Sequence, residues 1–458
     1  MPWLAPLAGH TDLALRVLCR EQGAAVACSE MISAKGLIYS QIRGRRKGLG
    51  REQGEAQPTQ QGTQQPQPGR NLDNGSAALL LTLPGSNSFA QTLSPALTLE
   101  NFPAPNTADE PLVIQLFGDD PDILGQAVEL LRGWGYDWFD LNLGCSVPKV
   151  VKTGAGAALA RDTDKTLRAA EAMIRAAGAL PSANINGVSK NEPAVPEYLN
   201  DAPGNIFGTP EKVSGAVLPA RGRVGFKLRL GWSATEENYL DLAKGLEQCG
   251  AGWLTLHPRY ARQYFAGNAD WSALARLRRA VSLPLMASGD LFDAASALRC
   301  LDESGVDGVM FARGAMHNPA IFSEYLTLVQ NAAPFTLTSS NEASAGVEPE
   351  SEFISEPGAE VASERISEAM RERAVALKRL MLRHAELARA MPEKNPHCRR
   401  RRGDKIRPDG ALLKMRGAIP RYVCELPGSR AFRVEMSLCE SWESFFETLE
   451  KFFQPFEY

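Results

Sequence analysis

The chain has 458 residues, of which 44% are hydrophobic and 22% charged, and 50 Lys and Arg against 53 Asp and Glu give a formal charge of −3. This composition excludes a wholly disordered protein, and the length predicts two or three domains. No run of 18 apolar residues occurs, and Asp12 comes before a signal-peptide pattern could be completed, so we expect neither a membrane partner nor secretion. The eight cysteines are widely spaced, which favours free thiols in a reducing compartment, the cytoplasm.

Three segments have compositions that favour solvated chain over packed structure. Residues 56–68 hold six Gln and three Pro, residues 182–221 are rich in Asn, Pro and Gly, and residues 331–364 hold seven Glu but no Lys or Arg. Polar tracts of this kind bury too little apolar surface to fold. We interpret them as spacers, with insertions at about 44–111 and 182–221 and an acidic linker over 331–364.

Between these segments, short apolar runs alternate with longer helical patterns. The predicted strands are 3–7, 24–29, 112–117, 137–143, 223–230, 252–257, 283–288 and 306–311. The predicted helices include 120–134, 163–178, 235–249, 270–281 and 293–304, several opened by an Asp, Ser or Thr N-cap. Eight βα repeats predict an α/β protein with a closed (β/α)8 TIM barrel over residues 1–330. The alternative, a doubly wound open sheet, normally begins with a GxGxxG turn, which does not follow the first strand here.

From residue 365 the pattern becomes helical, which predicts a C-terminal helical domain over 365–458. Residues 371–421 hold 16 Lys and Arg against 5 Asp and Glu, with a peak at the four arginines of 399–402. Positive charge concentrated in one segment indicates a polyanionic partner, and the alternative is an ordinary solvated face.

Polar residues gather at the C-terminal ends of the predicted strands, where barrels of this kind carry their chemistry. They are Gln115, Asp140, Asn142, Lys227, Arg229, His257, Ser288, Asp290 and Arg313. Because side chains alternate along a strand, Asp140 and Asn142 share one face, as do Lys227 and Arg229, and we expect that face to point into the barrel. So many polar groups together favour a binding site, since each needs a partner when buried.

Glycine turns follow the last two predicted strands, SGD at 288–290 and ARGA at 312–315. Glycine lets a phosphate approach the backbone and Arg313 adds a cation, so the turns predict a phosphorylated cofactor or substrate.

Cys145 lies in a glycine-rich loop directly after the fourth predicted strand. A thiol with a pKa near 8.5 is mostly protonated at neutral pH, so it can donate a proton or, once ionised, act as a nucleophile. We therefore expect a functional role for Cys145. The alternative for a single cysteine is a small buried apolar residue, which we expect for Cys19, Cys28, Cys249 and Cys300.

Taken in order, the motifs resemble those of the flavin-dependent tRNA-dihydrouridine synthases. They are LAPLAGHTD at 4–12, SEMISAKGL at 29–37, IQLFG at 114–118, DLNLGCSVPKVVKTGAGAAL at 140–159, FKLRLGW at 226–232, LHPRYARQYFAGNADW at 256–271, SGDL at 288–291 and GVMFARGAMHNPAIF at 308–322. The resemblance implies reduction of the C5–C6 double bond of specific uridines in tRNA, with FMN as cofactor and NADPH as electron donor.

The resemblance also implies roles for individual residues, with Cys145 as the catalytic proton donor. Cofactor contacts are expected at Pro6, Leu7, Ala8, Gln115, Lys227, His257, Ser288, Gly289, Asp290, Ala312 and Arg313. Substrate contacts are expected at Asn142, Arg229 and Arg259 and, in the basic segment, at Arg399 and Arg401. Neither a metal site nor an obligate protein partner is predicted.

Five positions depart from the family pattern: Leu7, Ser146, Pro258, Ser288 and Ala312 stand where Met, Pro, Gly, Asn and Gly are usual. A hydroxyl at position 288 and a backbone N–H at position 312 remain, so we expect adjusted FMN contacts rather than their loss. Two alternatives stay open: an RNA-binding barrel protein without catalysis, and an FMN barrel oxidoreductase acting on a small pyrimidine.

Overall fold

The computed structural model describes residues 1–41, 107–178, 223–331, 367–391 and 409–457. The segments interpreted as spacers lie outside these residues apart from 107–111 and Asn331, so for the remainder that interpretation stays a prediction. The predicted end of the first insertion at about 111 was wrong, because Thr107–Asp109 form a 3-10 helix and the buried Asp109 pairs with Arg16 at 2.8 Å. The arginines of 399–402 also lie outside the described residues.

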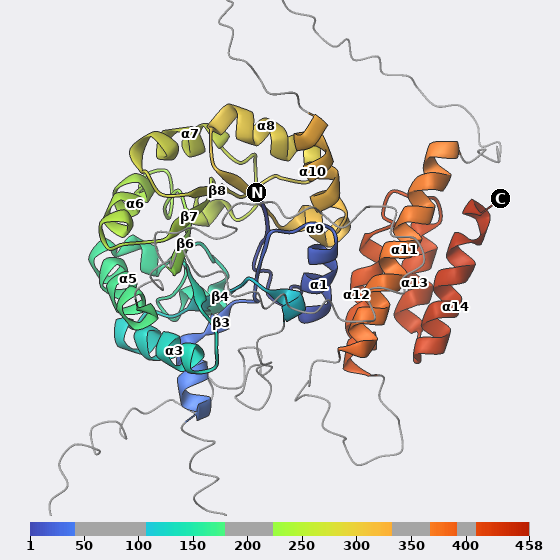
Figure 1. Cartoon of the computed structure of the whole chain (residues 1–458), viewed down its shortest axis with the longest axis horizontal. Coiled ribbons are helices and arrows are strands. Elements are labelled where there is room, and N and C mark those ends of the chain that lie inside the picture. Colours follow the sequence, from blue (N-terminus) through green and yellow to red (C-terminus); the bar gives the residue numbers. More distant parts are fainter. Residues whose placement is uncertain (42–106, 179–222, 332–366, 392–408, 458) are drawn as a thin grey trace, which may run out of the picture.

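Eight parallel strands close into a barrel in the described part of the chain (Figure 1). They are β1 (Pro2–Leu4), β2 (Val26–Cys28), β4 (Leu112–Phe117), β5 (Trp138–Asn142), β6 (Val224–Arg229), β7 (Trp253–His257), β8 (Leu285–Ala287) and β9 (Gly308–Phe311). Strand β1 pairs with both β2 and β9, and β2 pairs with β4, which closes the ring. A short strand that the sequence did not predict, β3 (Ile32–Ser33), extends the pairing of β4. The predicted TIM barrel is confirmed.

Helices surround the barrel, and most begin at an aspartate that caps them. They are α1 (Leu13–Glu21), α3 (Pro121–Gly133), α5 (Thr163–Ala177), α6 (Tyr239–Gln248), α7 (Trp271–Ala280), α8 (Ala294–Ser304) and α10 (Ile321–Asn331), with the short α4 (Pro148–Val151) and α9 (Arg313–His317). The side chains of Asp120, Asp162, Asp270 and Asp293 accept N–H bonds at the starts of α3, α5, α7 and α8.

One helix start was wrong. The helix predicted from residue 235 begins at Tyr239, because Gly231 forms a β-bridge with Glu237 and the Trp232 N–H donates to the Glu236 carbonyl at 3.1 Å. These contacts hold residues 231–237 in a turn that local helical spacing does not reveal.

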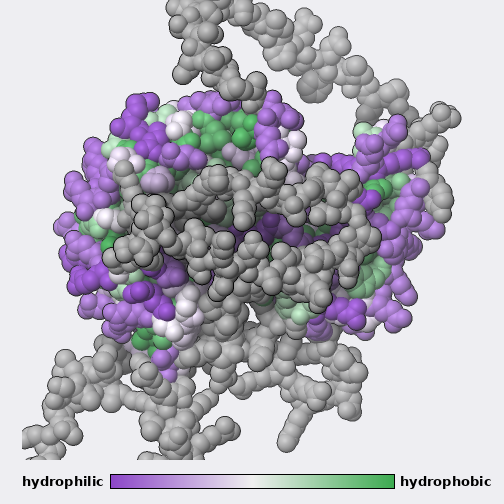
Figure 2. Space-filling view, viewed as in Figure 1, coloured by the Kyte–Doolittle hydropathy of each residue, from purple (hydrophilic) through white to green (hydrophobic). Residues whose placement is uncertain are grey.

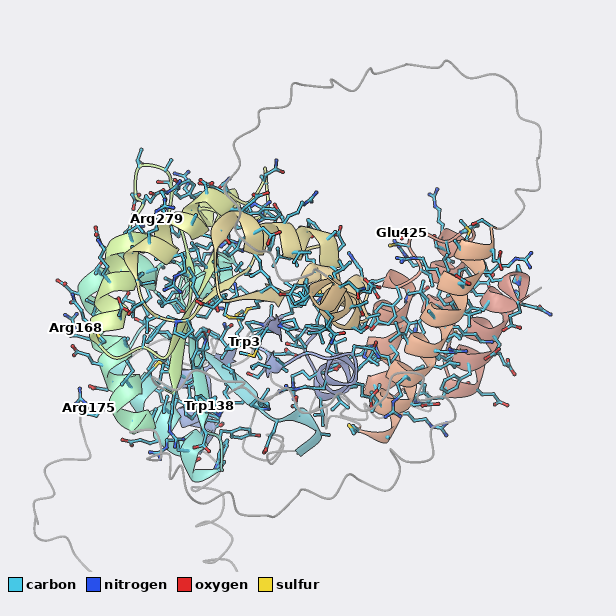
Figure 3. The ribbon with its side chains drawn as sticks, turned by 45° about the horizontal axis from the view of Figure 1, so that its top comes forward. Trp3, Trp138, Arg168, Arg175, Arg279 and Glu425 are labelled. Carbon is cyan, nitrogen blue, oxygen red and sulfur yellow. The ribbon has the colours of Figure 1, made fainter. Side chains whose placement is uncertain are left out.

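Alternate strand residues face two environments, as the period of two predicts. Leu141, Phe226 and Leu228 are buried in the apolar layer between strands and helices. The opposite face points into the barrel, and near its N-terminal end Trp3, Trp138 and Trp253 fill the interior. Figure 3 shows Trp3 and Trp138 within the ring of strands, whereas Arg168, Arg175 and Arg279 project outward from the helices.

The tryptophans close one end of the barrel. The ring centroids of Trp3 and Trp253 lie 5.7 Å apart, and those of Trp138 and Trp253 lie 6.4 Å apart. Gly225 makes this packing possible, because a Cβ there would lie 1.9 Å from the Trp253 ring. The polar strand ends therefore meet at the other, open end.

The predicted C-terminal helices are confirmed for the described residues as α11 (Glu368–Ala390), α12 (Gly410–Ala418), α13 (Ser429–Leu438) and α14 (Trp442–Phe453). They contact the barrel mainly through α1, since Val17 and Leu18 belong to the same apolar cluster as the helices' own core. An ion pair between Arg383 and Glu21, at 2.6 Å, joins the same two parts. In Figure 2, hydrophilic side chains dominate the periphery of both. No described helix is long and apolar enough to cross a bilayer.

The seven cysteines in the described ranges are free thiols, as predicted. Cys19, Cys28 and Cys300 are buried, but Cys249 is only partly buried. Cys249, at the C-terminal cap of α6, still packs against the main apolar cluster, so the predicted apolar role is met there without full burial.

Candidate active site

A chain of side-chain hydrogen bonds links strands β4 and β5 to the loop that carries Cys145. Parallel register places Gln115 beside Asp140, and Gln115 Nε2 donates to Asp140 Oδ2 at 2.7 Å. Asn142 Nδ2 donates to Gln115 Oε1 at 2.8 Å. Asn142 Oδ1 in turn accepts the backbone N–H groups of Cys145, at 2.8 Å, and of Gly144, at 3.2 Å. The position of the thiol loop is therefore tied to the barrel interior.

Asp140 and Lys227 interact electrostatically inside the barrel, and their pKa values move toward neutrality. Burial raises the pKa of Asp140 to about 7, against the hydrogen bond from Gln115 and the charge of Lys227. Burial and the nearby Arg229 cation lower the pKa of Lys227 to about 8. The Lys227 ammonium makes no side-chain hydrogen bond to any residue that the structure describes. It is thus a cation inside the barrel that a ligand could contact directly.

Cys145 is half-buried in its loop and packs against a small apolar cluster that contains Phe117, Val150 and Ala155. Burial raises the pKa of the thiol, opposed by a backbone hydrogen bond at Val147 and by the Arg229 and Lys227 charges. The thiol therefore stays protonated at neutral pH, as a proton donor requires.

The loop around Cys145 closes tightly. Gly156 has a φ of +64°, and a Cβ there would lie 2.6 Å from the Cys145 carbonyl oxygen. Arg229 holds the same loop from strand β6, since its Nε donates to the Gly144 carbonyl at 2.8 Å. The Arg229 Nη1 donates to the carbonyls of Tyr260 and Tyr264, so this arginine joins the loops after β5 and β7.

A second group of charges lies at the ends of β7, β8 and β9. Arg259 is only 2% exposed, and its two terminal nitrogens donate to the two oxygens of Asp290 at 2.8 and 2.5 Å. Asp290 also pairs with Arg313, at 3.2 Å. Burial and the cations Lys227, Arg229, Arg259 and Arg313 lower the pKa of His257 well below its usual value, so the imidazole is neutral.

The turn after β8 lies directly on His257. Gly289 has a φ of +103°, and a Cβ there would lie 2.7 Å from His257 Cδ2. Both the conformation and the close approach require glycine at this position. The predicted glycine turn at 288–290 thus has a definite structural cause.

The structure brings most of the predicted site residues to the open end. Gln115, Asn142, Lys227, Arg229 and His257 come from the inward faces of β4 to β7, and Ser288, Gly289, Asp290, Ala312 and Arg313 follow β8 and β9. Pro6, Leu7 and Ala8 lie in the loop after β1, half-buried or exposed. Arg259 and Asn142 already bond to protein groups, so their substrate contacts stay predictions, and Arg399 and Arg401 lie outside the described residues.

An aromatic rim that the sequence did not predict lies at this end. Phe265 and Phe292 are 58% and 48% exposed. The Arg313 guanidinium lies over both rings, 4.8 and 4.6 Å from their centroids, and the Phe265 ring lies 6.1 Å from that of His257. Two adjacent aromatics, Tyr264 and Phe265, in a polar loop after a strand were the signal that could have found it.

These observations define the class: a (β/α)8 barrel whose open end gathers cations, amides, a neutral imidazole and a protonated thiol. A family model described as dihydrouridine synthase matches residues 3–68, 80–184 and 212–400, which is most of the chain. The chain therefore belongs to the flavin-dependent dihydrouridine synthase family of oxidoreductases, which confirms the resemblance found in the sequence.

Individual relatives agree. A probable tRNA-dihydrouridine synthase of Rhodobacter capsulatus is 29% identical over 317 residues, which span 69% of this chain and 68% of the relative. A tRNA-dihydrouridine synthase B of Xanthomonas campestris is 26% identical over 321 residues, spanning 70% and 67% of the two chains. Among solved structures, an old yellow enzyme homologue from Zymomonas mobilis covers 73% of this chain and 89% of its own, at 12% identity and a TM-score of 0.35, a likeness too weak to carry an argument.

Proposed function

We propose that this protein is a tRNA-dihydrouridine synthase that reduces the C5–C6 double bond of uridines in tRNA, with FMN as cofactor and NADPH as electron donor. One observation carries the proposal: a protonated Cys145 thiol and a Lys227 cation stand together at the open end of a barrel of this family. The relatives do not favour the two alternatives, an RNA-binding barrel protein without catalysis and an oxidoreductase of small pyrimidines.

The residues at the open end fit a flavin. Besides the Lys227 ammonium, the buried Thr255 Oγ1 has no hydrogen-bond partner among the described residues. Flavin carbonyl oxygens and ring nitrogens are groups that could satisfy both. At the other side of the opening, the Gly289 turn, Ser288 and the Arg313 guanidinium would hold the phosphate.

A bound, reduced flavin would supply the hydride that adds to C6 of the uracil. Cys145 completes the reduction: its S–H bond breaks as a C–H bond forms at C5, and solvent later returns a proton to the thiolate. Lys227 would place a positive charge beside the flavin, where it would stabilise the negative charge of the reduced ring. Asn142 and Arg229 keep the thiol in place through the backbone of its loop.

The substrate must present a single base to this site. A uridine has to leave its stack to enter the barrel, at a cost of about a few kcal/mol. Phosphate contacts from the basic segment 371–421 would supply affinity that does not depend on sequence. The cytoplasm stays the predicted compartment for such an enzyme.

The test compares Cys145→Ala and Cys145→Ser with the unmodified enzyme. Both variants should purify yellow and oxidise NADPH, whereas dihydrouridine formation in tRNA, measured by mass spectrometry of digested RNA, should fall by about 10²–10⁴-fold. Full product yield from Cys145→Ala would remove the donor role. A colourless protein that FMN cannot reconstitute would count against the whole proposal.

A further inference from the structure

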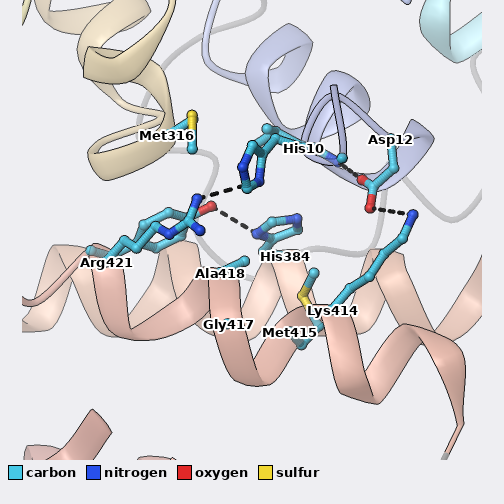
Figure 4. Close-up of a pocket in the computed structure, with 12 residues that line it drawn as sticks. His10, Asp12, Met316, His384, Lys414, Met415, Gly417, Ala418 and Arg421 are labelled. Carbon is cyan, nitrogen blue, oxygen red and sulfur yellow. Dashed lines mark hydrogen bonds and ion pairs between the residues drawn. The ribbon is translucent and has the colours of Figure 1, made fainter. Parts of the chain in front are cut away.

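A cavity of about 150 Å³ lies where the loop after β1 and helix α9 meet the C-terminal helices. Its polar lining consists of His10, Asp12, His384, Lys414 and Arg421, with Met316, Met415 and Tyr422 among the remaining residues. In Figure 4, His384 lies between two interacting pairs, His10 with Arg421 and Asp12 with Lys414. These residues come from three parts of the chain, and none belongs to the active site described above.

His384 carries a buried nitrogen without a partner. The residue is 2% exposed, and its Nδ1 lies 2.7 Å from the Tyr422 hydroxyl, while its Nε2 has no hydrogen-bond partner among the described residues. Burial lowers the pKa of His384 to about 4, so the ring is neutral and holds one proton.

The direction of the hydrogen bond with the Tyr422 hydroxyl determines which His384 nitrogen carries that proton. If Tyr422 donates to Nδ1, the proton sits on Nε2 and one donor is left unpaired. If Nδ1 donates instead, both the hydroxyl hydrogen and the Nε2 lone pair lack partners. The first arrangement leaves fewer buried polar groups unsatisfied, so His384 Nε2 is a hydrogen-bond donor in the lining of the cavity.

Arg421 contributes a cation that forms no ion pair with any carboxylate in the described part of the chain. Its one hydrogen bond within the described residues joins Nη1 to His10 Nδ1, at 3.3 Å. Burial and the Arg421 charge lower the pKa of His10, so its ring is neutral and accepts this bond. The second nitrogen of His10 then carries a proton and is a further donor.

The one carboxylate in the lining is already engaged. Asp12 Oδ1 accepts the Leu15 N–H at 3.0 Å, and Asp12 Oδ2 pairs with Lys414 at 3.3 Å. With both histidines neutral, the lining that the structure describes holds two cationic side chains, Lys414 and Arg421, and one carboxylate. Donors therefore outnumber acceptors around the cavity.

We propose that this cavity binds a phosphate group. A tetrahedral oxyanion matches a small space in which Arg421 and two imidazole N–H groups are donors from different elements, and it would satisfy His384 Nε2. The volume holds such a group together with a little water. Two sources share this chemistry, inorganic phosphate and a backbone phosphate of bound RNA. Binding inorganic phosphate requires no dihydrouridine activity, so the two proposals can fail separately.

The first measurement is thermal unfolding of the full chain loaded with FMN, so that the barrel site is occupied. Inorganic phosphate, compared with chloride at equal ionic strength, should raise the melting temperature of the unmodified protein by a few degrees at saturation. Arg421→Met and His384→Leu should abolish this rise. His384→Gln, which keeps a donor, should retain much of it, and Arg430→Met, at an exposed position on α13 outside the cavity, should retain all of it.

The second measurement identifies the source of the phosphate. If RNA occupies the cavity, Arg421→Met should lower the slope of log affinity for tRNA against log salt by about one relative to Arg430→Met, and inorganic phosphate should compete with tRNA. If free phosphate is the ligand, the two variants should bind tRNA alike while only Arg421→Met loses the thermal response. Absence of both the thermal response and the slope difference would overturn the proposal.

Discussion

Replacing Asn142 with alanine should displace the Cys145 thiol without removing it. The substitution deletes the oxygen that accepts the N–H groups of Gly144 and Cys145, at 3.2 and 2.8 Å, and the amide that donates to Gln115. At roughly 1 kcal/mol for each bond, with partial rescue by water at the half-buried loop, the variant should lose about 2–3 kcal/mol of unfolding free energy. A shift of the thiol by about 1 Å should slow protonation by about 100-fold.

The assay isolates the chemical step. Enzyme reduced beforehand with NADPH is mixed with tRNA in a single turnover, and dihydrouridine is counted by mass spectrometry against flavin content. The matched control is Asn142→Asp, whose carboxylate still accepts both backbone N–H groups but cannot donate to Gln115. We expect it to stay within about tenfold of the unmodified enzyme, a difference of about 1.4 kcal/mol.

The single-turnover rate of Asn142→Ala decides whether these bonds position the thiol. A fully flavinated Asn142→Ala enzyme that forms product at the unmodified single-turnover rate would show that these bonds do not position the thiol. Alkylation of Cys145, followed by peptide mass mapping, gives an independent reading. The loop freed by Asn142→Ala should react faster than in Asn142→Asp, and equal rates in the two variants would contradict the proposed restraint.

Two further predictions concern charge. The pKa of Lys227, about 8, means that the rate should decline as the pH rises through 8 and the ammonium is lost, while Cys145, whose thiol pKa is raised, is still protonated. Lys227→Arg should extend the pH–rate plateau upward because a guanidinium stays charged, and an unmoved alkaline limb would assign the titration elsewhere. Arg399→Ala with Arg401→Ala should weaken tRNA binding and lower its salt slope by about two, whereas an unchanged slope would place the phosphate contacts in another segment.

The barrel could be predicted from the sequence because its strands follow a local rule. The prediction of 112–117 matches β4 to the residue, and the alternation that set Lys227 apart from Phe226 also fixed which side chains point inward. Local patterns failed where distant residues decide the structure. The bridge between Gly231 and Glu237 makes helix α6 begin later in the chain than predicted, and the spacing of apolar residues does not indicate it.

The site was predictable as a set of residues but not as a set of contacts. Asn142 and Gln115 stand 27 positions apart, and Arg259 and Asp290 stand 31 apart, so their bonds depend on barrel closure. Asp290 was predicted to lie at the phosphate end, and its carboxylate pairs with Arg259 and Arg313. A phosphate bound there would therefore contact arginine side chains and backbone N–H groups rather than an unpaired carboxylate.

The charge balance of the open end limits what it can bind. Burial, together with Lys227, Arg229 and the two arginines on Asp290, lowers the pKa of His257 well below its usual value, and burial and Arg229 lower the pKa of Lys227. In return, Asp290 offers one negative charge, and Asp140, with a pKa of about 7, offers only part of a second, against four cations. Each cation therefore raises the electrostatic free energy of the others as long as no anion is bound. A ligand that brings both a phosphate and a ring that becomes negative on reduction relieves this repulsion at two points, whereas a neutral pyrimidine alone would relieve it at neither.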